Sequence, residues 1–133
     1  MKKILNFALC SLLAVHAFAF PSPRIKGKWR FAGGIYNGKS EGSTEGYQLQ
    51  RVYTDKVFNA YILATGSKPE KYQSGKYSVL GSDYTETETY SMQPSKLINK
   101  TVKYQIAMRK DTMILKGTLP TGMQVEEYWV RAK

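Results

Sequence analysis

Short runs of β-branched and aromatic residues, separated by clusters of Gly, Pro, Asn, Asp and Ser, recur from Trp29 to Arg131. Such runs are typical of β-strands, and almost no stretch shows the three-to-four-residue spacing of an amphipathic helix. The pattern predicts an all-β chain, with a bulge or bend in its first strand at Gly33 and Gly34. We expect eight strands, over residues 29–36, 47–53, 57–64, 75–80, 84–91, 101–108, 112–119 and 123–131.

The remaining residues form turns and three longer loops, over 37–46, 65–74 and 92–100, the last with one short helical turn at 96–98. Strands joined mainly by hairpins favour an eight-stranded antiparallel up-and-down β-barrel, because closure removes the unpaired sheet edges. A two-sheet sandwich of the same strands is the alternative.

Closure makes a geometric prediction about the first and last strands, which would pair with each other. Trp29 would then lie beside Arg131 at one end of the barrel. A guanidinium over an indole face contributes about 0.5–2 kcal/mol, depending on its desolvation. We therefore expect this pair to be structural and to close the barrel floor.

Residues 1–19 have the features of a signal peptide. A basic start is followed by the mostly apolar residues 4–15, and Ala17-Phe18-Ala19 offers small side chains at the positions that a signal peptidase reads. The apolar run is shorter than the roughly 20 residues that a membrane-spanning helix needs. A lipid anchor on Cys10 is disfavoured, since Leu9 precedes it. We expect cleavage after Ala19 and a periplasmic or secreted protein, with residues 20–26 as an N-terminal tail and 27–133 as the barrel domain.

Cleavage at this point leaves 114 residues with 18 basic and 10 acidic side chains, a net charge of +8 against +10 for the whole chain. It leaves no histidine and no cysteine, since His16 and Cys10 lie in the leader. Ser-His-Asp and Cys-His catalysis, imidazole or thiolate zinc sites and disulfides are thereby excluded. We expect no metal and no cofactor. The basic residues are scattered, which argues against nucleic acid and fits an anionic cell-surface component better.

Alternation along the last strand places Glu127 on the same face as Trp129 and Arg131. If that face points inward, the Glu127 carboxylate needs a partner, because an unpaired buried charge is costly. A structural partner within the barrel and a polar anchor for a ligand both remain open.

The strand at 84–91 carries Tyr84, Glu86, Glu88 and Tyr90 on one face, and Thr and Ser on the other. We expect the Tyr/Glu face to point inward, with Glu86 the better interior candidate of the two carboxylates. The reverse orientation, with threonines inside and solvated glutamates, is the alternative. Two carboxylates inside a barrel would raise the pKa of at least one of them and would indicate a functional interior.

Aromatic residues complete the expected lining. Phe58, Tyr77 and Tyr104 fall on the apolar faces of their strands, and tyrosines give an apolar wall with hydrogen-bonding tips, which suits amphipathic ligands. Arg51 would hold a carboxylate or phosphate if it pointed inward, or else lie at the rim. The candidate ligand-binding residues are Phe58, Tyr77, Glu86, Tyr104 and Glu127.

Several short stretches resemble the small lipocalin-like domains of exported bacterial proteins, which are calycin-type barrels. They are Gly27-Lys28-Trp29, Val57-Phe58, Gly75-Lys76-Tyr77, Tyr84-Thr85-Glu86 and the end from Glu127 to Arg131. The first is similar to the G-x-W signature of lipocalins, and Arg131 looks like the arginine that packs on that tryptophan. The helix that usually follows a lipocalin barrel is missing, which implies a reduced barrel. The resemblance implies apolar-ligand binding by analogy.

We therefore expect a monomeric, exported barrel that binds a small apolar or amphipathic ligand in its interior. The alternative is a protein-interaction module, such as a protease inhibitor that acts through its proline-stiffened tail, residues 20–24. An enzyme is disfavoured, because the mature chain leaves only carboxylate, Tyr and Lys chemistry, such as an isomerase or cyclase with Glu86 or Glu127 as base.

Overall fold

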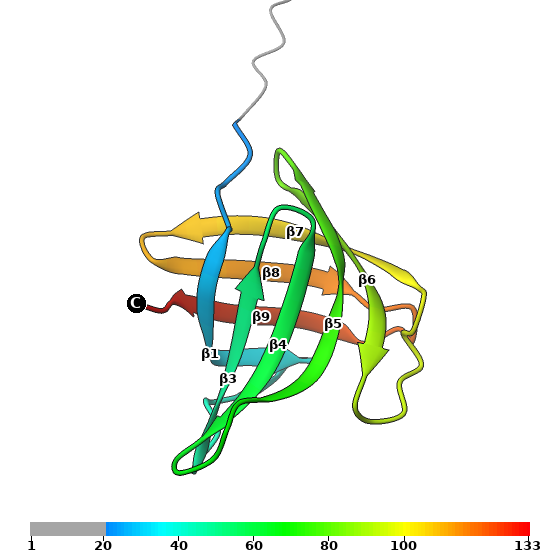
Figure 1. Cartoon of the computed structure of the whole chain (residues 1–133). Helices are drawn as coiled ribbons and strands as arrows, with labels where there is room; N and C mark the ends of the chain where they lie inside the picture. Colours follow the sequence, from blue (N-terminus) through cyan, green and yellow to red (C-terminus); the bar gives the residue numbers. More distant parts are fainter. Residues whose placement is uncertain (1–20) are drawn as a thin grey trace, which may run out of the picture.

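The computed structural model describes residues 21–133, which form nine strands and, within that range, no helix, so no described helix could cross a membrane (Figure 1). The expected signal peptide, residues 1–19, lies outside the described part. The strands are β1 (Gly27–Tyr36), β2 (Lys39–Glu41), β3 (Tyr47–Tyr53), β4 (Val57–Ala64), β5 (Glu70–Leu80), β6 (Asp83–Ser91), β7 (Thr101–Arg109), β8 (Thr112–Thr118) and β9 (Gln124–Arg131).

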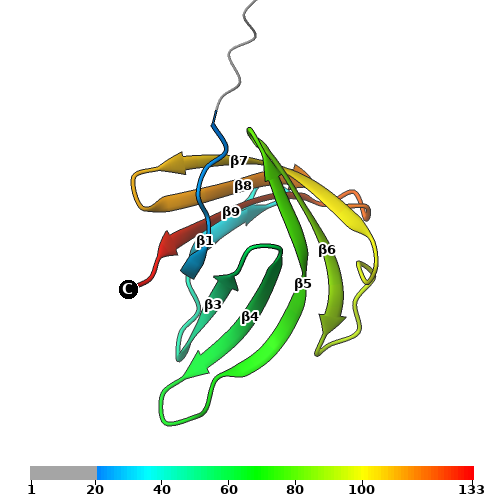
Figure 2. The same cartoon turned by 45° about the horizontal axis from the view of Figure 1, so that its top comes forward.

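The nine strands pair in antiparallel fashion in the order β2-β1-β3-β4-β5-β6-β7-β8-β9, so that β1 pairs with both β2 and β3, and each later strand pairs with the next along the chain. A further pairing of β1 with β9 closes the sheet, so eight strands form a barrel and β2 extends from its side. In Figure 1, β1, β3, β4 and β5 cross in front of β7, β8 and β9, and in Figure 2, where the view is turned, β3 and β4 lie below these three strands. The predicted up-and-down barrel is confirmed, and the two-sheet sandwich is wrong.

Strand β2 lies where a loop was expected. Asn37 and Gly38 both have positive φ, 49° and 81°, which is the conformation of a tight two-residue hairpin turn. The turn folds β2 back onto β1, with Tyr36 opposite Lys39. An Asn-Gly pair is the strongest short hairpin signal, so the sequence contained the information that the loop prediction missed.

Two other expectations about the loops are corrected. Strand β5 begins at Glu70 instead of at residue 75, directly after Pro69, which cannot donate to the ladder and so precedes the strand. Residues 96 and 97 lie in a turn that is not helical, and Ile98 makes a parallel bridge with Glu88 of β6.

Bulges interrupt the alternation of side chains in three places. One lies at Gly33 in β1, as expected, where φ is 124°. In β6, Tyr90 is opposite Ser74 while Glu88 is opposite the next residue of β5, which leaves Thr89 as an extra residue. The bulge turns Tyr90 outward, 43% exposed, so its predicted place on the interior face is wrong.

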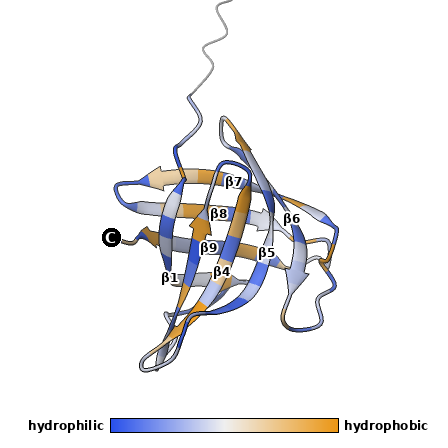
Figure 3. Ribbon diagram, viewed as in Figure 1, coloured by the Kyte–Doolittle hydropathy of each residue, from blue (hydrophilic) through white to orange (hydrophobic). Residues whose placement is uncertain are grey.

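One end of the barrel, the floor, is closed by packed side chains. Trp29 is opposite Arg131 in the β1–β9 ladder, and the guanidinium carbon lies 4.2 Å from the centre of the indole ring. The predicted floor pair is therefore present. Figure 3 shows apolar and polar residues alternating along the strands, and the apolar ones that face inward are buried. The largest fully buried side chains are Trp29, Phe58, Tyr84, Met113 and Leu115.

Residues 22–26, which we call the strap, lie across the floor. Arg131 donates from Nη1 to the Lys26 carbonyl at 3.1 Å and from Nη2 to the Arg24 carbonyl at 3.0 Å. The Trp29 indole donates to the Ile25 carbonyl at 2.7 Å, and Ile25 itself is 3% exposed. The strap is thus packed onto the barrel as part of the fold. The opposite end, where β1, β4, β6 and β8 end, is called the mouth.

Candidate functional site

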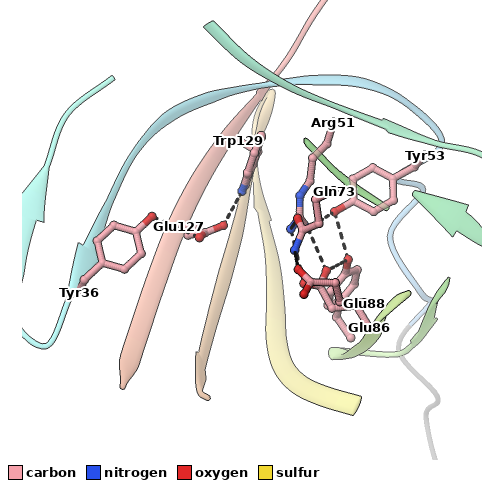
Figure 4. A network of polar contacts seen from close by, with 9 residues as sticks. Tyr36, Arg51, Tyr53, Gln73, Glu86, Glu88, Glu127 and Trp129 are labelled. Carbon is pink, nitrogen blue, oxygen red and sulfur yellow. Dashed lines mark hydrogen bonds and ion pairs between the residues drawn. The ribbon is translucent and has the colours of Figure 1, made fainter. Parts of the chain in front are cut away.

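Arg51, on β3, is at the centre of a polar network inside the barrel (Figure 4). Its Nη1 donates to Glu86 Oε2 at 2.9 Å and to the Tyr53 hydroxyl at 3.0 Å. Its Nη2 donates to Gln73 Oε1 at 3.1 Å and, more weakly, to Glu86 Oε1 at 3.4 Å. Arg51 is 6% exposed, whereas every other lysine and arginine among residues 21–133 is exposed. It is therefore the one interior cation of the described barrel.

The network continues along β6 through two carboxylates. The Tyr84 hydroxyl donates to Glu86 Oε2 at 2.5 Å and lies 3.1 Å from the Tyr53 hydroxyl. The Gln73 amide donates to Glu88 Oε2. Glu86 and Glu88 are each 7% exposed, so the Tyr/Glu face of this strand does point inward up to the bulge.

Two aromatic rings hold the Arg51 guanidinium in place. Its central carbon lies 4.7 Å from the Phe58 ring centre and 5.1 Å from that of Trp129, distances at which a cation and a ring attract. Burial is the largest single effect and lowers the pKa of Arg51, but Glu86, together with smaller contributions from Tyr53, Tyr84 and Glu127, outweighs it and holds this pKa well above its ordinary value. The guanidinium is therefore a fixed positive charge.

Glu127, on β9, is a third interior carboxylate and is partly buried. The Trp129 indole donates to its Oε2 at 2.9 Å, and the Tyr36 hydroxyl donates to its Oε1 at 3.2 Å. Burial first, and then the Glu127 charge, raise the pKa of Tyr36 above its ordinary value, so this hydroxyl keeps its proton. Glu127 thus has two neutral donors and no cation paired with it among the described residues.

Two buried polar atoms of the network have no hydrogen-bond partner within the described residues, namely Glu88 Oε1 and Arg51 Nε. Buried polar groups in native proteins are nearly always paired, with protein, with water or with a ligand. One of these atoms is an acceptor and the other is a donor. A group that both donates and accepts could therefore complete the network.

Apolar side chains surround the mouth above this network. They are only partly buried and pack against the core, which leaves part of each available for a further contact. Leu49 lies on β3, Leu97 on the connection before β7, and Leu119 and Met123 on the turn between β8 and β9. The interior therefore combines a polar end with an apolar rim.

The structure brings together most of the residues expected in the lining. Phe58, Glu86, Tyr104 and Glu127 all lie inside the barrel. Burial first, and then Glu86, raise the pKa of Tyr104 above its ordinary value. Tyr77 differs, because its hydroxyl donates to the Thr54 carbonyl in the turn between β3 and β4, at the floor.

Sequence reasoning missed or left open three parts of the network. Gln73 lay in the expected loop, Tyr36 was assigned no polar role, and Arg51 was left between the interior and the rim. The alternation of Arg51 with Tyr53 was the available signal for its inward side.

Among residues 21–133, no group of three or more His, Cys, Asp or Glu side chains is placed to hold a metal ion.

A cleft of about 1030 Å³ lies outside the barrel, between the strap and the floor ends of β3, β4 and β5. Its lining includes the basic residues Arg24, Lys26, Lys56 and Lys76, and Lys26 is paired with Asp55 at 2.6 Å. The Ser22 hydroxyl accepts a hydrogen bond from the Gly81 amide, which fixes the outer end of the strap. The tail is therefore held against the barrel from residue 22 onward.

No protein-family model and no curated protein sequence matches the chain. Among solved structures, an uncharacterized protein from Bacteroides eggerthii is similar, with a TM-score of 0.59 and 13% identity over 80% of this chain and 98% of that one. A variant of the fluorescent protein UnaG gives a TM-score of 0.42 and 9% identity over 82% and 96% of the two chains. The first likeness shows a shared fold, and the second has no bearing on function. The expected barrel architecture is confirmed, whereas the resemblance to a lipocalin-like family stays a prediction.

Proposed function

We propose that this chain is an exported binding protein whose barrel interior takes a small amphipathic ligand. The ligand's polar group would meet the network around Arg51 and Glu88, and its apolar part would contact the rim residues at the mouth. The apolar rim next to a fixed polar network supports this arrangement, since binding pockets combine apolar side chains with a few fixed polar groups.

The observation that carries the proposal is the incomplete network. A polar cluster that served only the fold would be expected to satisfy all its buried atoms, because a partly satisfied network costs more than an apolar core. Glu88 Oε1 and Arg51 Nε are buried without partners in the described chain. A ligand group, or a water that a ligand displaces, would supply them.

Native mass spectrometry of the exported protein, purified without lipid-stripping steps, tests the proposal. We expect a discrete added mass that is lost on denaturation. The matched variants are Glu88→Gln, which should reduce the occupied fraction, and Glu126→Gln, which removes the same charge from the outer face of β9 and should not. The proposal would be contradicted if the protein had the mass of the unliganded chain and also bound no added amphipathic probe.

The tail-based inhibitor has no specific observation in its favour. Residues 22–26 are held by Arg131, Trp29 and the Gly81 amide, so insertion of the tail into an enzyme would first require its release from the floor. Binding, and not catalysis, is proposed as the function.

A further inference from the structure

Acidic side chains outnumber basic ones inside a barrel whose outside is strongly basic. Arg51 is the one interior cation of residues 21–133, and its charge is matched by Glu86 through the ion pair at 2.9 Å. Glu88 and Glu127 are additional interior carboxylates. The interior therefore carries more negative charge than its own residues balance, while the chain as a whole is at +10.

Within the described residues, the side chains that donate hydrogen bonds to these two carboxylates are all uncharged. Glu88 Oε2 accepts from the Gln73 amide, and Glu127 accepts from the Trp129 indole and the Tyr36 hydroxyl. Neutral donors satisfy geometry but leave the charge in place. Glu88 is 7% exposed, so water solvates little of its charge.

Both carboxylates belong to one connected cluster. Trp129 donates to Glu127, and the face of its ring lies 5.1 Å from the Arg51 guanidinium carbon. Arg51 reaches Glu88 through Gln73, which accepts from the guanidinium and donates to the carboxylate. Figure 4 shows Glu127 on one side of Trp129, and Arg51, Gln73, Glu86 and Glu88 on the other.

We infer that the polar group of the ligand is a cation that donates hydrogen bonds, such as a primary ammonium, and that its counter-charge is Glu88. The unpartnered Glu88 Oε1 accepts one of the ammonium hydrogens, and Glu127 adds to the attraction. The inference rests on the proposed function, because it names the chemical class of ligand for the same interior. A neighbouring oxygen acceptor on the ligand would also pair with the free Arg51 Nε.

Three probes with the same eight-carbon chain separate the possibilities, namely octylammonium, octanol and octanoate, with affinity measured by calorimetry at fixed ionic strength. We expect octylammonium to bind about ten to a hundred times more tightly than octanol, because a charge-assisted hydrogen bond is stronger than a neutral one. Octanoate should bind most weakly. This ranking needs no variant and is therefore independent of any folding defect.

Glu88→Gln keeps the size of the side chain and removes its charge. It should reduce the preference for octylammonium over octanol by about tenfold. Glu126→Gln is the control, since Glu126 accepts from Tyr128 on the outer face of β9 and changes the net charge equally. That variant should leave the ratio unchanged.

The outcomes distinguish the two proposals. If octanol or octanoate binds as tightly as octylammonium, the interior is an amphipathic site but the inference about a cation is wrong. The same conclusion follows if Glu88→Gln and Glu126→Gln have equal effects on the ratio. If none of the three probes binds and native mass spectrometry shows no ligand, the proposed function is wrong as well.

Discussion

Replacing Arg51 by methionine would keep most of the side-chain volume between Phe58 and Trp129 while removing the interior cation. Four hydrogen bonds from the guanidinium would be lost, to Tyr53, to Gln73 and twice to Glu86. Methionine still fills the space between the two rings, so the change is chiefly one of charge.

The expected cost follows from what the substitution leaves behind. Glu86 would retain the Tyr84 hydroxyl as a donor but would be a buried carboxylate without a counter-charge. Breaking a buried ion pair from one side costs about 3–5 kcal/mol, a large part of the roughly 5–15 kcal/mol by which a domain is stable. In the double variant Arg51→Met with Glu86→Gln no charge of the pair remains. We expect it to be more stable than the single Arg51→Met variant by about 2 kcal/mol.

Urea unfolding followed by tryptophan fluorescence measures both quantities. The exposed Arg30→Met is the matched control and should change the free energy of unfolding by less than about 0.5 kcal/mol. The reasoning would be refuted if Arg51→Met cost less than about 1 kcal/mol. It would also be refuted if the double variant were as unstable as the sum of the two single variants.

Three further predictions concern the floor, the buried tyrosines and the close packing of β5. Arg131→Ala should destabilise the barrel by about 2–3 kcal/mol, because the contact with Trp29 and two charged hydrogen bonds to the strap are lost. The affinity for the proposed ligand should change less. An unchanged melting temperature would contradict this prediction. Burial raises the pKa of Tyr104, so its contribution to stability is complete below about pH 10, where an unfolded tyrosine begins to ionise, and is lost as the pH rises further. Urea titrations between pH 8 and pH 11 give the free energy of unfolding at each pH. In the Tyr104→Phe variant this free energy should fall less steeply with pH, by at most about 1.4 kcal/mol per pH unit. An equal slope in the variant and the unaltered protein would argue against the prediction. In Gly75→Ala the new methyl group would collide with the Thr87 carbonyl oxygen, which should lower the free energy of unfolding by about 1–3 kcal/mol or more. Gly42→Ala is the control, because a methyl group there meets nothing nearby. Equal melting temperatures for the two variants would refute the packing argument.

Alternation and turn chemistry were sufficient to predict the barrel and its floor. Closure follows from the number of strands and their short turns, and closure in turn predicts the contact between Trp29 and Arg131. The same alternation predicts that Glu86 and Glu127 share faces with buried aromatic residues. These are local properties of each strand, so one sequence is enough to derive them.

The network around Arg51 depends on contacts between strands that no local pattern reveals. Arg51 and Glu86 come from β3 and β6, and their pairing decides that the guanidinium points inward and not to the rim. Gln73 was unpredictable for a different reason, since Pro69 led to a loop assignment for residues that begin β5. Tyr90 shows a third limit, because one extra residue in β6 reverses the side of the sheet on which later residues lie.

Both ends of the described chain leave the barrel at the floor, where Ala132 donates to the Lys28 carbonyl and the strap is held by Arg131. An attachment at either end therefore presents the mouth away from the point of attachment. For surface-based binding assays, immobilisation through a tag after Lys133 would leave the mouth unobstructed, which is where the proposed ligand would enter. Linkage through the turn after β1 or β8 would instead obstruct it, so orientation on the chip becomes a direct assay of which end the ligand enters.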